Sequence, residues 1–336
     1  MTADMGRTDN SLLVADIGGT NARFSLARVK AGGIDVASPT IYRTADYPGL
    51  ETALAHFLDN AGRPTLAGAA VCAAGPVEGK GNAAYISMTN SRWNVTAEAL
   101  ARVAGVERPR LMNDFAALAL SIPGLEASDL SPVGPAREAL AGEPVGILGA
   151  GTGLGVASLV FGAGEEVVVP GEGGHVDLAA GNDREAAVIA WLRARYGHVS
   201  VERVLSGPGL VTLYGALAAL SGKEADPALT PPDIAERARR GTCDIASETV
   251  QLFCGWLGAV AGDLALTIGA RGGIYIGGGI VPSWLAGGPG LFSEEIFRAR
   301  FEAKGRFSAW LSRIPVHVIC RKDAALLGLA RAARDA

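Results

Sequence analysis

The sequence predicts an α/β fold in which helices cover the faces of β-sheets. Strand-like and helix-like segments alternate along most of the 336 residues. A strand–glycine turn–strand unit near the amino terminus also recurs when Gly18 is laid on Gly151. Because the length suits about two domains of ~150 residues each, we interpret the repeat as an internal duplication in which each copy opens one domain.

The first copy consists of the apolar runs 12–15 and 22–27, which we expect to be strands, around the turn 16–21. Glycine-rich turns can aim several backbone N–H groups at one point, which is how an uncharged loop binds phosphate. Asp16 ends an apolar strand, where burying a lone carboxylate is costly. Since Mg²⁺ commonly binds through one carboxylate and several waters, we predict that Asp16 associates with a metal–phosphate complex. The alternative is an Asp that caps its own turn.

The second copy consists of the runs 145–148 and 156–161 around the turn 149–155, with Gly149 where the first copy has Asp16. The usual phosphate and hydrolase motifs GxxxxGK[ST], GxGxxG, HExxH and GxSxG do not occur in the sequence. The two paired turns and a third glycine loop, 277–279, are therefore the candidate anion-binding elements.

The remaining segments predict the elements of two layered domains. Between the copies we expect helices at 50–58 and 96–104, strands at 67–73 and 84–88, and a short strand that ends at 111–112 before a helix at 115–120. After the second copy we expect helices at 185–196, 208–219, 233–240 and 322–334, and strands at 273–276 and 314–319. The long apolar segment 243–270 carries Gly255, Gly258 and Gly262, which would let another element approach closely.

Polar side chains at three places are candidates for chemistry. Asn113 and Asp114 lie at a strand-to-helix junction, where Asp114 is either a helix cap or a general base that accepts a proton from an attacking hydroxyl. Glu172 and His175 lie among glycines with little covering bulk, which favours contact with a ligand. A metal pair there would need a third ligand, and none occurs at a sensible spacing. Glu202 by itself is typical of a charge on a helix surface.

Composition excludes several functions. Thirty Lys and Arg against 34 Asp and Glu give a net charge of −4, and aromatic residues make up 6%, which argues against nucleic acid as the main partner. The uncharged stretches 144–164 and 272–292 contain too many glycines or prolines to be lipid-facing helices, so no membrane partner is expected. The four cysteines are far apart and predict reduced thiols of a cytoplasmic protein.

Eight motifs, in order, resemble those of bacterial glucokinases in the actin-like ATPase superfamily. They are LVADIGGTNARF at 13–24, AAGPV at 73–77, MTNSRW at 88–93, MNDFA at 112–116, GAGTGLG at 149–155, PGEGGH at 170–175, ERVLSGPG at 202–209 and IGGG at 276–279. Together they span the chain from about residue 12 to 330. A second glucokinase lineage carries a cysteine-rich zinc motif after its active-site His; no cysteine follows His175 closely, so the resemblance is to the lineage without zinc.

The resemblance implies a two-domain actin-like ATPase (ribonuclease H-like) fold with duplicated β-hairpin phosphate loops and an interdomain cleft. On this basis we expect a disordered extension at 1–11, a small α/β domain of 12–124 plus 321–336, and a large α/β domain of 125–320.

The implied activity is transfer of the ATP γ-phosphate to the 6-hydroxyl of D-glucose, with Asp114 as general base. Asn113, Glu172, His175, Glu202 and Asn90 would hold the other sugar hydroxyls. Asp16, Gly18, Gly19, Thr20, Asn21, Gly151, Thr152 and Gly153 would hold the ATP phosphates, with Mg²⁺ bound at Asp16 through water, and Gly277, Gly278 and Gly279 would contact the adenosine. Gly75 and its neighbouring connecting segments would act as hinges that close the cleft.

The resemblance further suggests a cytoplasmic homodimer. It leaves two alternatives open: the same chemistry on another hexose or an amino sugar, and a non-enzymatic, ATP-driven conformational module of the same superfamily. ATP is the expected donor, with ADP or polyphosphate as the other donors to be tested.

Overall fold

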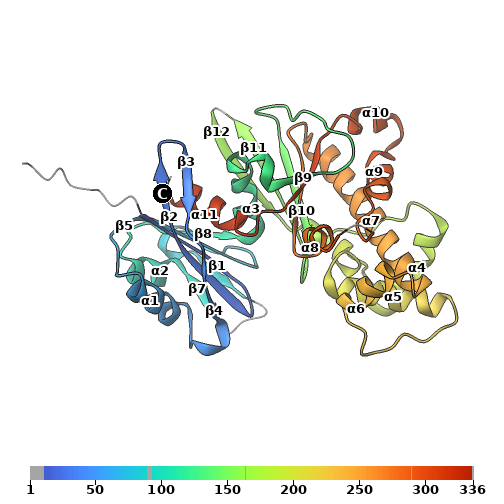
Figure 1. Cartoon of the computed structure of the whole chain (residues 1–336), viewed down its shortest axis with the longest axis horizontal. Coiled ribbons are helices and arrows are strands. Elements are labelled where there is room, and N and C mark those ends of the chain that lie inside the picture. The colour runs from blue at the N-terminus through green and yellow to red at the C-terminus, as the bar shows by residue number, and fades with distance from the viewer. Residues whose placement is uncertain (1–10, 89–92, 163, 289, 335–336) are drawn as a thin grey trace, which may run out of the picture. The chain divides into compact units, whose positions relative to one another are not determined.

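The computed structural model describes residues 11–88, 93–162, 164–288 and 290–334 (Figure 1). Its contacts divide the chain into two compact units. Unit 1 contains the described residues up to Glu126 together with those from Arg321 onward, and unit 2 is Ala127–Cys320. The expected disordered extension falls outside the described residues except for Ser11, which is buried and begins the first strand.

Unit 1 is built on a six-stranded sheet of order β3-β2-β1-β5-β8, with β4 paired to β2. Its strands are β1 (Ser11–Ile17), β2 (Asn21–Lys30), β3 (Gly33–Val36), β4 (Thr40–Arg43), β5 (Leu66–Ala73) and β8 (Arg110–Asn113). β1 and β2 form an antiparallel hairpin, whereas β1, β5 and β8 run parallel. β6 (Tyr85–Ser87) and β7 (Asn94–Thr96) pair separately. The carboxyl ends of β1, β5 and β8 therefore meet at one edge of the sheet.

Helices cover both faces of this sheet. α1 (Leu50–Asn60) and α2 (Ala97–Ala104) pack against Leu13, Ala15 and Ile17 of β1. α3 (Asp114–Ser121) and α11 (Ala324–Arg334) pack against the alternate residues Leu12 and Val14. Because side chains alternate along a strand, Asp16 belongs to the face that α3 covers.

Unit 2 contains a second six-stranded sheet, β12-β11-β10-β13-β14-β9, whose first five strands repeat the order and directions of β3-β2-β1-β5-β8. Its sixth strand, β9, pairs antiparallel with β14, whereas the sixth strand of unit 1, β4, pairs with β2. The strands of unit 2 are β9 (Leu130–Pro132), β10 (Val145–Ala150), β11 (Leu154–Gly162), β12 (Glu165–Gly171), β13 (Gly273–Gly278) and β14 (Val316–Ile319). β10 and β11 form the antiparallel hairpin, and β10, β13 and β14 run parallel. The two predicted hairpins are thus the equivalent elements of two equivalent sheets.

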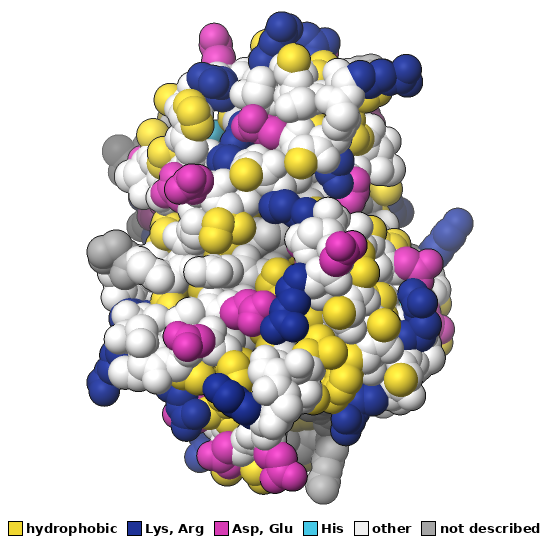
Figure 2. All heavy atoms as spheres, turned by 90° about the vertical axis from the view of Figure 1, so that its right-hand side faces the viewer, with side chains coloured by type: hydrophobic (Ala, Val, Ile, Leu, Met, Phe, Trp, Pro, Cys, Tyr) yellow, Lys and Arg dark blue, Asp and Glu magenta, His cyan; other side chains and the backbone are white. Residues whose placement is uncertain are grey.

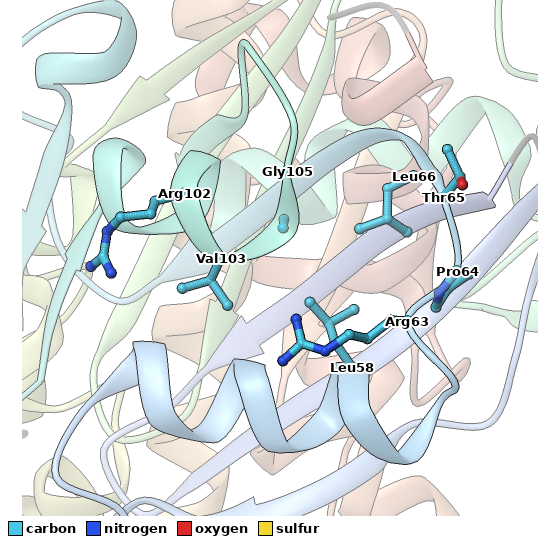
Figure 3. Close-up of a pocket in the computed structure, with 9 residues that line it drawn as sticks. Leu58, Arg63, Pro64, Thr65, Leu66, Arg102, Val103 and Gly105 are labelled. Carbon is cyan, nitrogen blue, oxygen red and sulfur yellow. The ribbon is translucent and has the colours of Figure 1, made fainter.

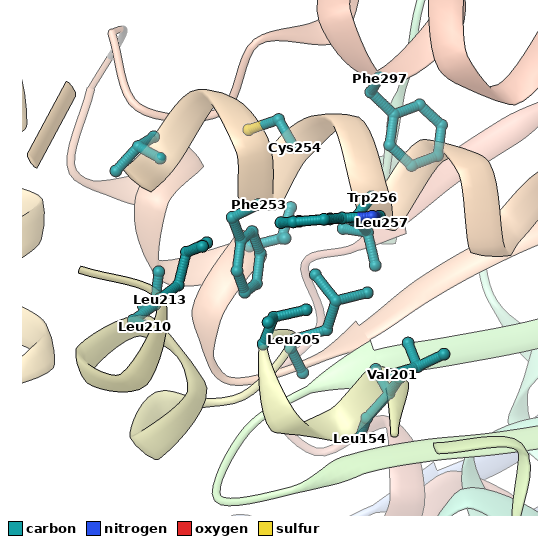
Figure 4. Packing of buried hydrophobic residues seen from close by; sticks show 14 of the residues in the cluster. Leu154, Val201, Leu205, Leu210, Leu213, Phe253, Cys254, Trp256, Leu257 and Phe297 are labelled. Carbon is teal, nitrogen blue, oxygen red and sulfur yellow. The ribbon is translucent and has the colours of Figure 1, made fainter. Parts of the chain in front are cut away.

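One large hydrophobic cluster joins the sheet and helices of unit 2. The helices are α4 (Asp183–Tyr196), α5 (Gly207–Leu220), α6 (Pro231–Arg239), α7 (Asp244–Ile268), α8 (Ile280–Ala286), α9 (Glu294–Glu302) and α10 (Ser308–Leu311). Figure 4 shows Phe253 and Trp256 of α7 in this cluster, together with Leu205 and with Leu210 and Leu213 of α5.

The glycines of α7 bring α9 into backbone contact, as their spacing predicts. A Cβ atom on Gly258 would collide with the carbonyl of Phe297, and one on Gly262 would lie 2.5 Å from the carbonyl oxygen of Phe301. Gly255 also faces α9, with Ile296 and Arg300 as its nearest neighbours. The close approach is confirmed, although the sequence pattern does not predict α9 itself.

α7 is long and apolar enough to cross a membrane by length and composition, with a mean hydropathy of 1.4 in its most apolar window. Half of that window is buried inside the structure. Among the described residues, α7 is the one helix that is long and apolar enough to cross a membrane. A helix in the core of a globular domain can have the same length and hydropathy. The contacts of α7 with α5, α6 and α9 are those of a core helix.

Figure 2 shows one face of the molecule, on which Lys and Arg side chains alternate with Asp and Glu. No broad region of a single sign is visible on this face. The mixed charges agree with the small net charge of the chain.

Candidate active site

The first hairpin turn joins β1 to β2 and is closed by the Gly18 N–H, which donates to the Asn21 carbonyl at 2.9 Å. The segment after β4, a 3₁₀ turn η1 (Thr44–Asp46), supports this turn from one side. Thr44 donates from Oγ1 to the Gly19 carbonyl at 2.7 Å and from its backbone N–H to the Thr20 carbonyl at 3.0 Å. Gly19 and Thr20 themselves are exposed. The turn is thus open on one side to a ligand and anchored on the other.

Asp16 lies at the end of β1, opposite Arg23 on β2 and beside Cys72 on β5. Arg23 Nη1 donates to Asp16 Oδ2 at 2.8 Å, and Cys72 Sγ donates to Oδ1 at 3.6 Å. Burial raises the pKa of the Cys72 thiol well above its usual range, and the negative charges of Asp16 and Asp114 raise it further. The thiol therefore stays protonated beneath two carboxylates. The Asp16 side chain is 22% exposed, so it can still reach an ion or a water.

The sequence leaves open whether Asp114 is a helix cap or a general base, and the contacts of Asn113 and Asp114 bear on this choice. Asn113 is the N-cap of α3, because its Oδ1 accepts from the N–H groups of Phe115 at 2.8 Å and Ala116 at 3.4 Å. Asn113 Nδ2 donates to the Gly75 carbonyl at 3.2 Å. Asp114 is the first residue of α3, half-buried, and its Oδ1 accepts from the Phe115 N–H at 2.9 Å. The capping role belongs to Asn113, which leaves Asp114 as the candidate base.

The second hairpin turn joins β10 to β11 and is closed by the Gly151 N–H, which donates to the Gly153 carbonyl at 2.8 Å. The Gly207 N–H holds the Gly151 carbonyl at 2.8 Å. Where the first copy carries Asp16, this copy carries Gly149, and a Cβ atom there would collide with the backbone of Gly277. The close packing of β10 on β13 explains why this copy has no carboxylate at the equivalent position.

The third glycine loop follows β13 and adjoins the second turn. The Gly279 N–H donates to the Ala150 carbonyl at 3.0 Å. Gly278 has φ +77°, and a Cβ atom on it would collide with the same carbonyl. Glycine is thus required where the two loops meet, and the structure places 277–279 beside the hairpin turn 151–153.

Two neighbouring 3₁₀ turns carry Glu172, His175 and Glu202. Glu172 directly precedes η5 (Gly173–His175), which ends at His175, and Glu202 lies in η6 (Val201–Arg203). The Val201 N–H at the start of η6 donates to the carbonyl of Val176, the residue after η5, at 3.0 Å, and this bond holds the two turns side by side. Glu202 Oε2 accepts from the Leu154 N–H at 2.8 Å, so its half-buried carboxylate sits at the exit of the second hairpin. Glu202 is therefore not the helix-surface charge that its local sequence suggests.

Glu172 and His175 are accessible to a ligand. Their side chains are 65% and 62% exposed, and Glu172 Oε2 lies 4.0 Å from His175 Nε2. Within the described ranges, no group of three or more His, Cys, Asp or Glu side chains is placed to hold a metal ion. Asn90, the remaining predicted sugar ligand, lies outside the described residues.

A separate cavity of about 300 Å³ in unit 1 does not include the predicted site residues (Figure 3). It is lined by Leu58, Arg63, Pro64, Thr65, Leu66, Arg102, Val103, Ala104 and Gly105. Arg63 pairs with Asp59 at 2.5 Å and Arg102 pairs with Glu51 at 2.8 Å. Both cations already have carboxylate partners and lie at helix C-termini, where the helix dipole disfavours anions.

Arg23, Cys72 and Thr44 support the site but are not among the residues predicted from sequence. Arg23 could have been found from the register of the hairpin, because a 16–23 pair follows from a turn at 18–21. Cys72 and Thr44 contact the site from β5 and from the end of β4, and no local signal marks either of them.

Known proteins match this chain over nearly its whole length. A family model described as Glucokinase matches residues 13–336. The glucokinase of Aromatoleum aromaticum is 47% identical, covering 96% of this chain and 95% of its own, and that of Nitrobacter hamburgensis is 44% identical, covering 97% and 98%. The crystal structure of a glucokinase from an Antarctic psychrotroph superposes with a TM-score of 0.87 at 34% identity, covering 97% of this chain and 99% of that one. The predicted fold class, a two-domain α/β fold of the actin-like ATPase kind, is confirmed.

Proposed function

Because this chain belongs to the glucokinase family, we propose that it transfers the γ-phosphate of ATP to the 6-hydroxyl of D-glucose and releases glucose 6-phosphate and ADP. The observation that carries the proposal is the sheet edge of unit 1. There the parallel strands β1, β5 and β8 bring the open hairpin turn, Asp16 and Asp114 to the same end. A phosphate-binding turn beside a candidate base is the arrangement that phosphoryl transfer to a hydroxyl needs.

Asp114 is the proposed general base. Its carboxylate takes the proton of the 6-hydroxyl as the hydroxyl oxygen forms a bond to the γ-phosphorus. The bond between that phosphorus and the bridging oxygen breaks, and ADP leaves with the electron pair. Asn113 caps α3 and holds the Gly75 carbonyl, so it fixes the helix end from which the Asp114 side chain projects. The expected role of Asn113 as a sugar ligand stays a prediction. The expected role of Gly75 as a hinge that closes the cleft also stays a prediction.

Glu172, His175 and Glu202 are the proposed ligands of the other sugar hydroxyls. Carboxylates accept paired hydrogen bonds from neighbouring hydroxyls, and a buried acceptor left unpaired penalises a sugar that lacks the right hydroxyl. The pairing of η5 with η6 supports a common sugar-facing role for these three residues. Asn90 would join them.

The turns 18–21 and 151–153 are proposed to hold the ATP phosphates through backbone N–H groups, and 277–279 to contact the adenosine. Asp16 fits a magnesium ion carried by the nucleotide, because it is a single, partly exposed carboxylate at the phosphate turn and Mg²⁺ keeps several waters. Arg23 already holds one of its oxygens, which favours contact through water. When bound, Mg²⁺ would neutralise charge on the transferring phosphate.

A coupled assay that follows glucose 6-phosphate with ATP and Mg²⁺ tests the proposal. It is repeated with mannose, fructose and glucosamine as acceptors and with ADP and polyphosphate as donors. The highest kcat/KM is expected for glucose and ATP. A higher kcat/KM for another sugar would favour the alternative hexose kinase, and ATP hydrolysis without glucose, together with polymer formation, would favour the conformational module.

We further propose that the protein acts in the cytoplasm as a homodimer. The described cysteines are all free thiols, which suits a reducing compartment. Light scattering during size-exclusion chromatography would measure the mass in solution. A mass near twice 34.3 kDa is expected, and a monomer would contradict the proposed assembly.

A further inference from the structure

We infer that Thr44 is a positioning residue for the ATP phosphates, because it holds the carbonyls of Gly19 and Thr20 in the first hairpin turn and so directs the Thr20 N–H to the open side. The inference rests on the proposed function, in which the turn 18–21 binds phosphate. Thr44 lies outside the glycine-rich motif and 24 positions beyond Thr20 in the sequence.

Thr44 makes two hydrogen bonds to consecutive peptide groups. Its hydroxyl donates to the Gly19 carbonyl at 2.7 Å, and its backbone N–H donates to the Thr20 carbonyl at 3.0 Å. Thr44 is 7% exposed, whereas Gly19 and Thr20 are exposed. The pairing of β4 with β2, in which Arg43 lies opposite Asn21, brings Thr44 to this place.

The direction of the N–H groups follows from peptide geometry. In a trans peptide the C=O and N–H bonds point in opposite directions. The Gly19 carbonyl and the Thr20 N–H belong to one peptide group, so a hydroxyl that holds this carbonyl points the Thr20 N–H away from Thr44. The Gly19 N–H belongs to the preceding peptide group, which Thr44 does not hold, so Thr44 orients the Thr20 N–H of the two. Among the described residues, no acceptor is found for either N–H group. Two such donors in an exposed turn are suited to binding an anion.

Thr44 is itself held in place. The carbonyl of Thr44 accepts from the Tyr47 N–H at 3.4 Å. The carbonyl of Tyr47 accepts from Nε1 of Trp93 at 3.2 Å, and Trp93 is buried. The Tyr47 hydroxyl lies 2.7 Å from Nδ1 of His56 on α1. The anchor of the turn is therefore fixed to the core of unit 1.

The second hairpin is also anchored through two consecutive carbonyls, but by backbone donors and at the positions that correspond to Ile17 and Gly18. The N–H groups of Gly207 and Gly279 hold the carbonyls of Gly151 and Ala150. In the first hairpin one of the two anchors is the Thr44 hydroxyl, which a substitution can remove without changing the backbone.

The test compares Thr44→Val, which removes the hydroxyl at similar volume, with Thr44→Ser, which keeps it. Thr249→Val is the matched control, because Thr249 is fully buried in α7 and its hydroxyl donates to the Ile245 carbonyl at 2.7 Å. We expect Thr44→Val to raise the KM for ATP about three- to tenfold, the range of one lost hydrogen bond, with the KM for glucose unchanged. Thr44→Ser should restore the KM for ATP, and Thr249→Val should leave both KM values unchanged.

Calorimetric titration with ATP and Mg²⁺ in the absence of glucose should show the same loss of affinity in Thr44→Val. If Thr44→Val does not fold, Thr44→Ala is measured in its place. An unchanged KM for ATP, an equal rise in both KM values, or no rescue by serine would overturn the inference. If the wild-type protein does not phosphorylate glucose with ATP, the proposed function fails instead, and the titration still decides whether Thr44 affects nucleotide binding.

Discussion

The Oε2 atom of Glu202 accepts a hydrogen bond from the backbone N–H of Leu154 at 2.8 Å. This bond joins a proposed sugar ligand to the first residue after the second phosphate turn. A Cβ atom on Gly153, the residue before Leu154, would collide with the same oxygen. The proposed sugar side and the proposed phosphate side of unit 2 are therefore linked through one carboxylate, which would have to shift if residue 153 carried a Cβ atom.

We predict that Gly153→Ala lowers kcat/KM for glucose about 10- to 100-fold, because a displacement of about 1 Å at a substrate-holding group has effects of this size. Steady-state kinetics at saturating ATP measure it. Gly162→Ala is the control, since a Cβ atom on Gly162 meets no atom within 4 Å. A Gly153→Ala enzyme with wild-type kcat/KM would show that the Glu202 carboxylate can move without consequence.

Asp114→Asn should lower kcat about 10²- to 10⁴-fold, the usual contribution of a general base. The amide oxygen of Asn can still accept the hydrogen bond that Phe115 N–H gives to Oδ1, so α3 should begin unchanged. Glucose affinity, measured by equilibrium titration, should stay close to that of the wild type. A kcat near the wild-type value would refute the assignment of Asp114 as the base.

Gly258→Ala should destabilise the protein by about 1–2 kcal/mol. The added methyl group collides with the Phe297 backbone, and crowding of this kind costs about 1–3 kcal/mol, partly offset by about 1 kcal/mol of helix propensity. Gly215→Ala in α5 meets no atom within 4 Å, so it should stabilise by up to about 1 kcal/mol. Urea unfolding measures the free energy of unfolding of both variants relative to the wild type. If this free energy changes in the same direction in both, the expected cost of crowding between α7 and α9 is contradicted.

His317 should make the free energy of unfolding fall as the solution is acidified. Its ring stacks on Tyr275 with 5.4 Å between centroids, and burial lowers its pKa below the ordinary 6.5. The unfolded chain therefore takes up the proton first, so stability is lost as the pH falls from 6.5 through the lower pKa of the folded state. His317→Phe keeps the stacking, and its unfolding free energy should vary less between about pH 7 and about pH 5. A pH dependence equal to that of the wild type would contradict this prediction.

Much of the fold follows from local sequence patterns. The hairpins β1–β2 and β10–β11 lie where the two glycine-rich turns predict them, because hairpin partners are only a few residues apart. The helix that begins at Asp114 is also confirmed. The apolar pattern does not predict α9, because the charged residue Arg298 interrupts the apolar face of this helix. Arg298 is nevertheless buried, and its Nη1 donates to the Ile314 carbonyl at 3.1 Å.

For the site, the amino-acid sequence by itself determined the two turns, the polar side chains beside them and the family to which they point. Only the tertiary structure decided which of Asn113 and Asp114 caps the helix, that Glu202 faces the hairpin, and that Thr44 and Cys72 support the first turn. The reason is physical. A turn or a helix start depends on the dihedral preferences of a few adjacent residues. A contact between residues 24 or 56 positions apart, as for the Thr44 N–H with the Thr20 carbonyl and the Cys72 thiol with the Asp16 carboxylate, exists only once strands have paired and both faces of the sheet are covered.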